Sequence, residues 1–287
     1  MDLLCCESTS KSVAQKDPTL LHDDRVFNTM LQSEKRCLPA ADYLTTVQSD
    51  LTPNLRKIVV DWMWEVCEEQ KCQEDIFPLA VNYLDRFLSK NPIQKNHLQL
   101  LGTTCLLVSS KLRECESLTV DLLILYTDNT VSSEDLLMWE LLLLSILKWD
   151  VSALTAHDFL WYILKRLNLD TVKPFVDIVV KHCGTFIGMC VRDYKFCSYL
   201  PSVIAGASIA AALNGLEYAA IHKYDLFTKL HVITGAKKET LKACQEQIEA
   251  IVESHKRQRK EQMDFALYEE KPVYEKTVES IDPKCWI

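Results

Sequence analysis

Glycine is scarce in this sequence, with 6 residues in 287, and few segments alternate between polar and apolar residues. A sheet protein needs period-two alternation in its strands and glycine in many of its turns, so both absences count against strands. Leucine-rich segments with apolar residues three and four positions apart dominate instead. Because 48% of the residues are hydrophobic, the chain has enough apolar side chains for real cores. We therefore predict an all-α fold.

An excess of positive charge, long apolar runs and the features of a secretory signal are also lacking. The formal net charge is −8, which argues against nucleic-acid binding as the main function. No apolar run reaches the roughly 18 residues of a membrane span. Residues 1–7 have neither a basic region nor a long apolar core, so they do not resemble a secretory signal. We expect an intracellular protein with no nucleic-acid and no membrane partner.

The chemistry of an enzyme is missing as well. The 12 cysteines are expected to be free thiols, because a chain without a secretory signal stays in a reducing compartment. Cys67 and Cys72 have no second ligand pair at zinc spacing, so no metal site is expected. There is no glycine-rich phosphate loop and no nucleophile with an evident base partner. The sequence therefore favours a non-catalytic protein without a cofactor of its own.

Composition divides the chain into four segments. Residues 1–22 are polar and are predicted to be flexible, and residues 255–287 form a polar tail too poor in apolar residues for a core. Residues 23–152 are predicted to hold one helix near 23–38, followed by five helices at about 53–70, 75–89, 95–112, 118–126 and 133–147. Residues 153–254 are predicted to hold five more, at about 156–167, 170–190, 200–213, 224–231 and 237–253.

The two five-helix blocks share one feature. Each contains a segment that is apolar all round and has small residues inside it, at 98–105 and 202–209. A helix of this kind is enclosed by its neighbours, and its small residues allow close approach. Each block is therefore predicted to pack around one central helix.

The segment 53–69 has the sequence pattern that is most specific to a protein family. Its apolar residues recur at 55, 58, 59, 62, 63 and 66, and Thr52 and Pro53 provide a helix start. With Arg56, Asp61 and Glu65 at fixed places, it resembles the signature helix of the cyclin box. Two tandem five-helix blocks are the duplicated cyclin-box architecture, which the resemblance implies for this chain.

Further segments resemble the D-type branch of the cyclins. They are 62–72, 77–88, 126–129 and 241–250, in the same order along the chain. Near the N-terminus, Leu3, Cys5 and Glu7 form an L-x-C-x-E motif, with which D-type cyclins dock on retinoblastoma-family pocket proteins. One departure concerns Thr277, which is followed by Val278 where D-type cyclins carry a Thr-Pro phosphorylation site that triggers turnover.

The resemblance also implies roles for individual residues. Lys111 and Glu140 match the pair that contacts a kinase around its αC helix, whereas spacing alone equally fits two ordinary solvated charges. Arg56 and Asp85 match a buried structural ion pair between packed helices. The groove that binds Arg-x-Leu peptides of substrates and inhibitors is matched by Leu55, Ile58, Val59, Trp62, Glu65, Leu98 and Gln99, although Ile58 and Val59 could also belong to the core.

The resemblance to D-type cyclins implies that the chain is a regulatory subunit. It would bind and activate cyclin-dependent kinase 4 or 6 and direct it to retinoblastoma-family proteins, promoting passage from G1 into S phase, in the nucleus and the cytoplasm. The alternatives are a transcription-type cyclin and a cyclin-fold transcription factor. The latter would need a basic surface and usually an N-terminal zinc ribbon, and the sequence offers neither.

Overall fold

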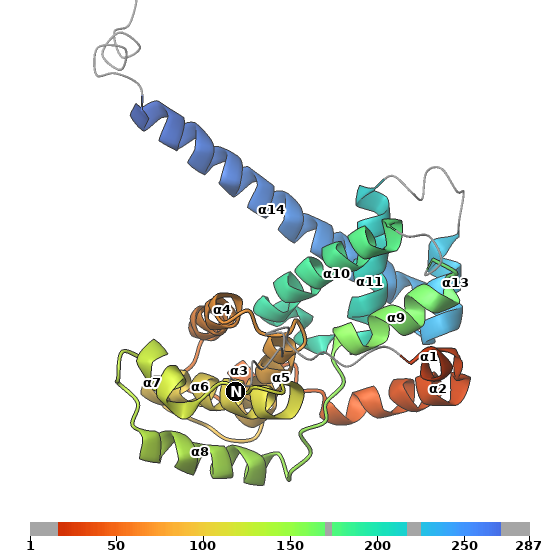
Figure 1. The fold of residues 1–287 in the computed structure, drawn as a ribbon. Helices are drawn as coiled ribbons and strands as arrows, with labels where there is room; N and C mark the ends of the chain where they lie inside the picture. Colours follow the sequence, from red (N-terminus) through yellow and green to blue (C-terminus); the bar gives the residue numbers. More distant parts are fainter. Residues whose placement is uncertain (1–16, 170–173, 217–224, 271–287) are drawn as a thin grey trace, which may run out of the picture.

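The computed structural model describes residues 17–169, 174–216 and 225–270, and it contains helices and no β-strand within these ranges. The first block consists of five helices, as predicted (Figure 1). They are α4 (Pro53–Glu69), α5 (Ile76–Leu88), α6 (Leu98–Arg113), α7 (Val120–Tyr126) and α8 (Ser133–Ile146). In the second block the described helices are α9 (Ala156–Arg166), α10 (Phe175–Arg192), α11 (Pro201–Gly215), α13 (Leu226–Thr234) and α14 (Lys238–Glu270).

Each block packs around the predicted central helix. All residues of α6 from Leu98 to Ser110, apart from the half-buried Gln99, are buried, and α6 contacts α4, α5, α7 and α8. In the second block α11 contacts α9, α10, α13 and α14. Gly102 shows how close these helices lie, because a Cβ added there would come within 2.9 Å of a methyl carbon of Val59 on α4. Two separate hydrophobic cores result, one in each block.

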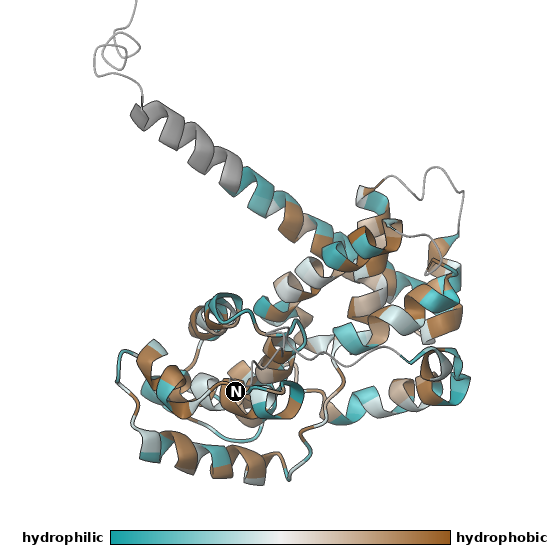
Figure 2. Ribbon diagram, in the orientation of Figure 1, coloured by the Kyte–Doolittle hydropathy of each residue, from teal (hydrophilic) through white to brown (hydrophobic). Residues whose placement is uncertain are grey.

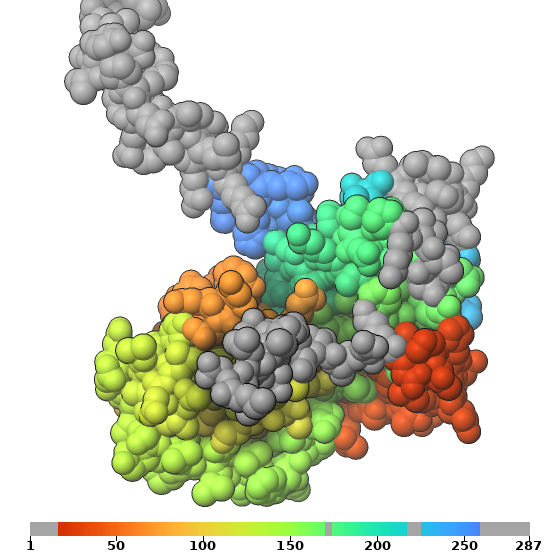
Figure 3. All heavy atoms as spheres, in the orientation of Figure 1, coloured from red at the N-terminus to blue at the C-terminus, as the bar shows by residue number. Residues whose placement is uncertain are grey.

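The N-terminal helices pack against the second block, although they precede the first block in the sequence. Here α1 (Pro18–His22) and α2 (Asp24–Ser33) lie against α9 (Figure 3). Phe27 stacks on Tyr162 with ring centroids 5.9 Å apart, and the Arg166 guanidinium lies 4.1 Å from the centre of the Phe27 ring. Glu34 accepts hydrogen bonds from the backbone N and the Oγ of Ser202, both at 2.9 Å, in the first turn of α11. The N-terminal helices are thereby tied to the second block.

Several helix boundaries differ from the predictions. The predicted flexible segment 1–22 includes α1, and the predicted helix 23–38 ends at Ser33, where a 3₁₀ turn η1 (Glu34–Cys37) follows. A second 3₁₀ turn, η2 (Lys95–His97), precedes α6, and α3 (Tyr43–Thr46) was not predicted. Helix α10 is described from Phe175, with Pro174 at its N-cap, and residues 170–173 of the predicted helix lie outside the described residues.

The largest difference is at the C-terminal end. Helix α14 continues to Glu270, so the first part of the predicted polar tail is helical. Residues 255–270 are rich in lysine, arginine, glutamate and glutamine, which have high intrinsic helix propensity. No helix in the described part of the chain combines the length and apolar character that crossing a membrane requires.

Candidate functional site

Lys111 and Glu140 lie together on the surface of the first block. Lys111 stands in the last turn of α6, where that buried helix emerges, and Glu140 lies in the middle of α8. The Nζ of Lys111 is 2.7 Å from Oε1 and 2.9 Å from Oε2 of Glu140. The lysine side chain is 44% exposed and the glutamate side chain 15% exposed. The two residues that the resemblance singled out as a pair thus form an ion pair.

An apolar surface accompanies this pair, and the sequence analysis did not predict it. Helix α8 buries Leu136 and Leu143, and its Trp139, Leu144 and Ile146 pack partly buried against the core of the first block. Its other large apolar side chains face outward. Four of them are between 41% and 66% exposed, and we call them the α8 apolar face: Leu137, Met138, Leu141 and Leu142. In Figure 2, α8 lies at the lower edge of the molecule and much of it is coloured as hydrophobic. Such a contiguous exposed patch marks a surface for a partner.

A signal for this face was present in the sequence. Helix α8 is apolar on nearly every side, but it is not the central helix of its block. A helix at the edge of a domain can bury only one of its sides. If apolar residues occur on all sides of such a helix, some of them must be exposed to solvent. Leu112, next to Lys111 in α6, is also exposed. The ion pair and the apolar face both belong to the outer surface made by α6 and α8.

The residues proposed for a peptide groove separate into two groups. Ile58 is 58% exposed, Trp62 and Leu55 are half-buried, and Glu65 is exposed, so these four form a stripe along α4 that solvent reaches. Gln99 is half-buried and lies on α6, the helix that packs against α4. Val59 and Leu98 are buried in the core, where Val59 packs against Gly102. The prediction that Val59 and Leu98 line an accessible groove is therefore corrected, since they lie beneath the surface.

Arg56 and Asp85 form a buried ion pair between α4 and α5. The Arg56 Nε lies 2.8 Å from Oδ1 of Asp85 and its Nη2 lies 2.7 Å from Oδ2. Arg56 also donates to the carbonyls of Val191 and Arg192 at the end of α10, both at 3.3 Å. Although burial by itself lowers the pKa of Arg56, the Asp85 carboxylate raises that pKa well above its ordinary value. Arg56 thus stays charged, and its bonds to Asp85 and to the end of α10 connect the two blocks.

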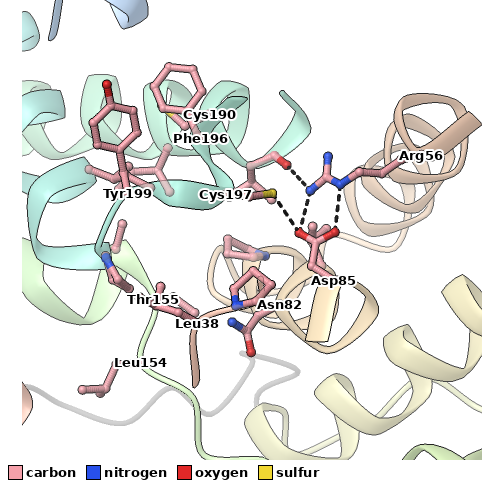
Figure 4. A pocket seen from close by; sticks show the side chains of 18 residues that line it. Leu38, Arg56, Asn82, Asp85, Leu154, Thr155, Cys190, Phe196, Cys197 and Tyr199 are labelled. Atoms are coloured by element: carbon pink, nitrogen blue, oxygen red, sulfur yellow. Dashed lines mark hydrogen bonds and ion pairs between the residues drawn. The ribbon is translucent and has the colours of Figure 1, made fainter. Parts of the chain in front are cut away.

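Two more donors complete the surroundings of Asp85. The Tyr43 hydroxyl donates to Oδ1 at 2.7 Å, and the Cys197 thiol donates to Oδ2 at 3.4 Å. Burial, and then the Asp85 charge, raise the pKa of Tyr43 above its ordinary value. Figure 4 shows Arg56, Asp85 and Cys197 at the wall of a cavity of about 90 Å³ between the two blocks. Because both oxygens of the buried Asp85 carboxylate accept hydrogen bonds from side chains of the protein itself, this network is suited to structure rather than to chemistry.

Other predictions concern sites that the described residues do not contain. The L-x-C-x-E motif of Leu3, Cys5 and Glu7 lies outside the described residues. In the ranges 17–169, 174–216 and 225–270, no group of three or more His, Cys, Asp or Glu side chains is arranged to hold a metal ion.

Comparison with known proteins agrees with this architecture. Family models for the cyclin N-terminal domain and the cyclin C-terminal domain match residues 25–152 and 154–281. The chain is 45% identical to G1/S-specific cyclin-D2 of Gallus gallus over 98% of this chain and 96% of that protein. It is 49% identical to G1/S-specific cyclin-D3 of Mus musculus over 88% of this chain and 86% of that one.

A third relative and a solved structure give the same picture. Identity to G1/S-specific cyclin-D1 of Homo sapiens is 45%, over 91% of this chain and 89% of that protein. The crystal structure of a viral cyclin from herpesvirus saimiri superposes with a TM-score of 0.68 at 24% identity, covering 78% of this chain and 97% of the viral one, which supports the fold. The chain belongs to the cyclin family and, within it, to the D-type cyclins.

Proposed function

We propose that this cyclin is the regulatory subunit of a cyclin-dependent kinase of the 4/6 type, and that it promotes the transition from G1 to S phase. The observation that carries the proposal is the Lys111–Glu140 ion pair beside the α8 apolar face. An exposed apolar face with a fixed charge pair at its side suits a partner that offers an amphipathic helix. The kinase αC helix is the proposed partner element.

The pair is prepared for binding before the partner arrives. A lysine ammonium has three hydrogens to donate, and Lys111 directs two hydrogen bonds to the two oxygens of Glu140. The third hydrogen is left for a partner, such as a backbone carbonyl of the kinase. Because Glu140 already holds the lysine side chain, less conformational entropy is lost on association.

Binding at this surface would act on the kinase through its αC helix. A helix held inward allows the catalytic Lys–Glu pair of a kinase to form, and it favours an ordered activation loop. ATP and magnesium belong to the kinase in this scheme, and the cyclin contributes no catalytic group. The proposal thus assigns an activating rather than an enzymatic role to the chain.

The decisive experiment is co-purification with cyclin-dependent kinases 4 and 6, followed by phosphorylation of a retinoblastoma C-terminal fragment. Lys111→Glu should abolish binding and activity, because it sets two negative charges side by side on the surface that meets the kinase. The melting temperature should stay the same, because the substitution lies at the surface and leaves the core intact. Lys57→Glu is the matched control, since Lys57 is also an exposed lysine paired with a carboxylate, Asp61 of α4. Retained kinase binding in Lys111→Glu would refute the proposed surface.

For substrate docking, we propose the exposed stripe of α4. Ile58 and Trp62 would bury the leucine of an Arg-x-Leu peptide from a substrate or a kinase inhibitor, and Glu65 would pair with its arginine. Glu65→Lys should weaken binding of such a peptide while leaving kinase association intact, because Glu65 is exposed and supports no core contact. Equal peptide affinity in Glu65→Lys, and likewise in Trp62→Ala, would exclude this stripe as the docking surface.

We also propose that Leu3, Cys5 and Glu7 dock on retinoblastoma-family pocket proteins. Docking through this motif would raise the local concentration of the substrate at the kinase. Cys5→Gly should remove pocket-protein binding without affecting the kinase complex, and unchanged binding would mark the motif as a coincidence. Such a complex would act in both the nucleus and the cytoplasm, which fractionation of cells expressing the protein would test.

A further inference from the structure

The turn that ends α4 brings two cysteines into contact. The backbone N of Cys72 donates to the carbonyl of Cys67 at 2.9 Å, and the N of Lys71 donates to the carbonyl of Glu68 at 3.1 Å. Lys71 adopts a left-handed conformation, with φ of 51°. These two bonds and the left-handed residue define a Schellman motif, in which the side chains at the ends of the longer bond meet. Both of those side chains are thiols here.

The two thiols differ in accessibility. Cys67 is buried at 7% exposure, Cys72 is half-buried, and neither forms a disulfide. A hydrogen bond between the thiols, together with burial and the charge of Glu114, raises the pKa of Cys67. Cys67 therefore stays protonated, and Cys72 is the sulfur that a reagent from solvent meets first.

We propose that Cys67 and Cys72 form a redox-sensitive pair that closes to an intramolecular disulfide when hydrogen peroxide oxidises it. The Cys72 sulfur attacks one peroxide oxygen, the O–O bond breaks, and the products are the Cys72 sulfenic acid and one water. The Cys67 sulfur then attacks the Cys72 sulfur, the S–O bond breaks, and a second water leaves with the Cys67 proton. Each sulfur gives up one electron, and the peroxide takes up both.

The position of the pair determines what the disulfide would restrain. Beside it, Gln70 donates to the Tyr126 hydroxyl of α7 at 2.6 Å, and the N of Gln73 donates to Oε1 of Glu114 after α6 at 2.8 Å. The turn is thus the place where α4 is tied to α7 and to the end of α6. Because the thiols already touch, closing the bond requires side-chain rotation and no movement of a helix. The oxidised protein should melt at a higher temperature than the reduced protein.

Peptide mapping tests the proposal directly, because trypsin cuts after Lys71, between the two cysteines. The reduced full-length protein is treated with hydrogen peroxide, its remaining thiols are alkylated, and the digest is analysed by mass spectrometry. We expect peptides 58–71 and 72–86 to appear joined, two hydrogens lighter than their sum, and to separate on reduction. Cys72→Ser should lose both the joined peptide and the rise in melting temperature.

Cys115 provides the matched control, since it is an exposed cysteine next to Glu114 on the neighbouring connection. Cys115→Ser should retain the joined peptides and the stabilisation. A disulfide that joins Cys72 to Cys115 would overturn the proposal. So would full alkylation of both Cys67 and Cys72 after a peroxide treatment that oxidises other cysteines of the chain.

Discussion

Removal of Arg56 should destabilise this cyclin more than removal of any exposed charged residue. The variant Arg56→Ala loses two short hydrogen bonds to Asp85 and two longer ones to the carbonyls of Val191 and Arg192. Asp85 is only 4% exposed, so its carboxylate would stay buried with no cation beside it. Breaking a buried pair in this way costs about 3–5 kcal/mol, because desolvation is no longer offset.

The size of the destabilisation depends on the hydrogen-bond donors that Asp85 retains. Tyr43 and Cys197 still donate to the Asp85 carboxylate, which favours the lower part of that range. Urea unfolding of the wild type and the variant, followed by circular dichroism, measures the difference. The double variant Arg56→Met with Asp85→Leu should recover part of the loss, since a well-packed apolar pair often replaces a buried ion pair at small cost.

A control variant separates the effect of losing a buried ion pair on stability from the effect of losing a charge at the surface. Arg36 pairs with Asp150, but its side chain is 61% exposed, so Arg36→Ala should have a far smaller effect. If Arg56→Ala unfolds at the same urea concentration as Arg36→Ala, the pair does not connect the blocks as the geometry indicates. Kinase binding per folded molecule should change little in either variant, because neither Arg56 nor Arg36 belongs to the Lys111–Glu140 surface.

Two further predictions concern the core and the pH dependence of stability. Gly102→Ala should destabilise by about 1–3 kcal/mol in urea unfolding, because its Cβ would lie 2.9 Å from Val59, whereas Gly188→Ala has no atom within 4 Å and should not destabilise. Burial lowers the pKa of His157 to about 4 from 6.5, and its Nδ1 has no hydrogen-bond partner. The folded state then binds fewer protons than the unfolded state between these values, so stability is present above pH 6.5 and is lost as the pH falls toward 4. Acidification from pH 7 to pH 5 should cost about 2 kcal/mol more in wild type than in His157→Gln, and equal losses would contradict the assignment.

The sequence determined the helices and their grouping. The spacing of apolar residues predicted α4 and its start at Thr52 and Pro53, and the structure places a hydrogen bond from the N of Leu55 to the Thr52 side chain there. The all-round apolar segments at 98–105 and 202–209 predicted the central helices. These are local patterns, and periodicity encodes them because a helix repeats every 3.6 residues. The extent of α14 escaped prediction, since its charged C-terminal half has helix propensity but no apolar stripe.

The functional surface depended on the tertiary structure. Residues 111 and 140 are 29 positions apart, and only the packing of α6 against α8 brings their charges within 2.7 Å. Likewise, the sequence shows only that α8 is apolar on nearly every side, and the exposed face appears because α8 lies at the edge of its block. Val59 and Ile58 are neighbours in the chain, yet one is core and the other surface. Periodicity reports that a helix has an apolar side, whereas burial depends on which helices the fold places against it.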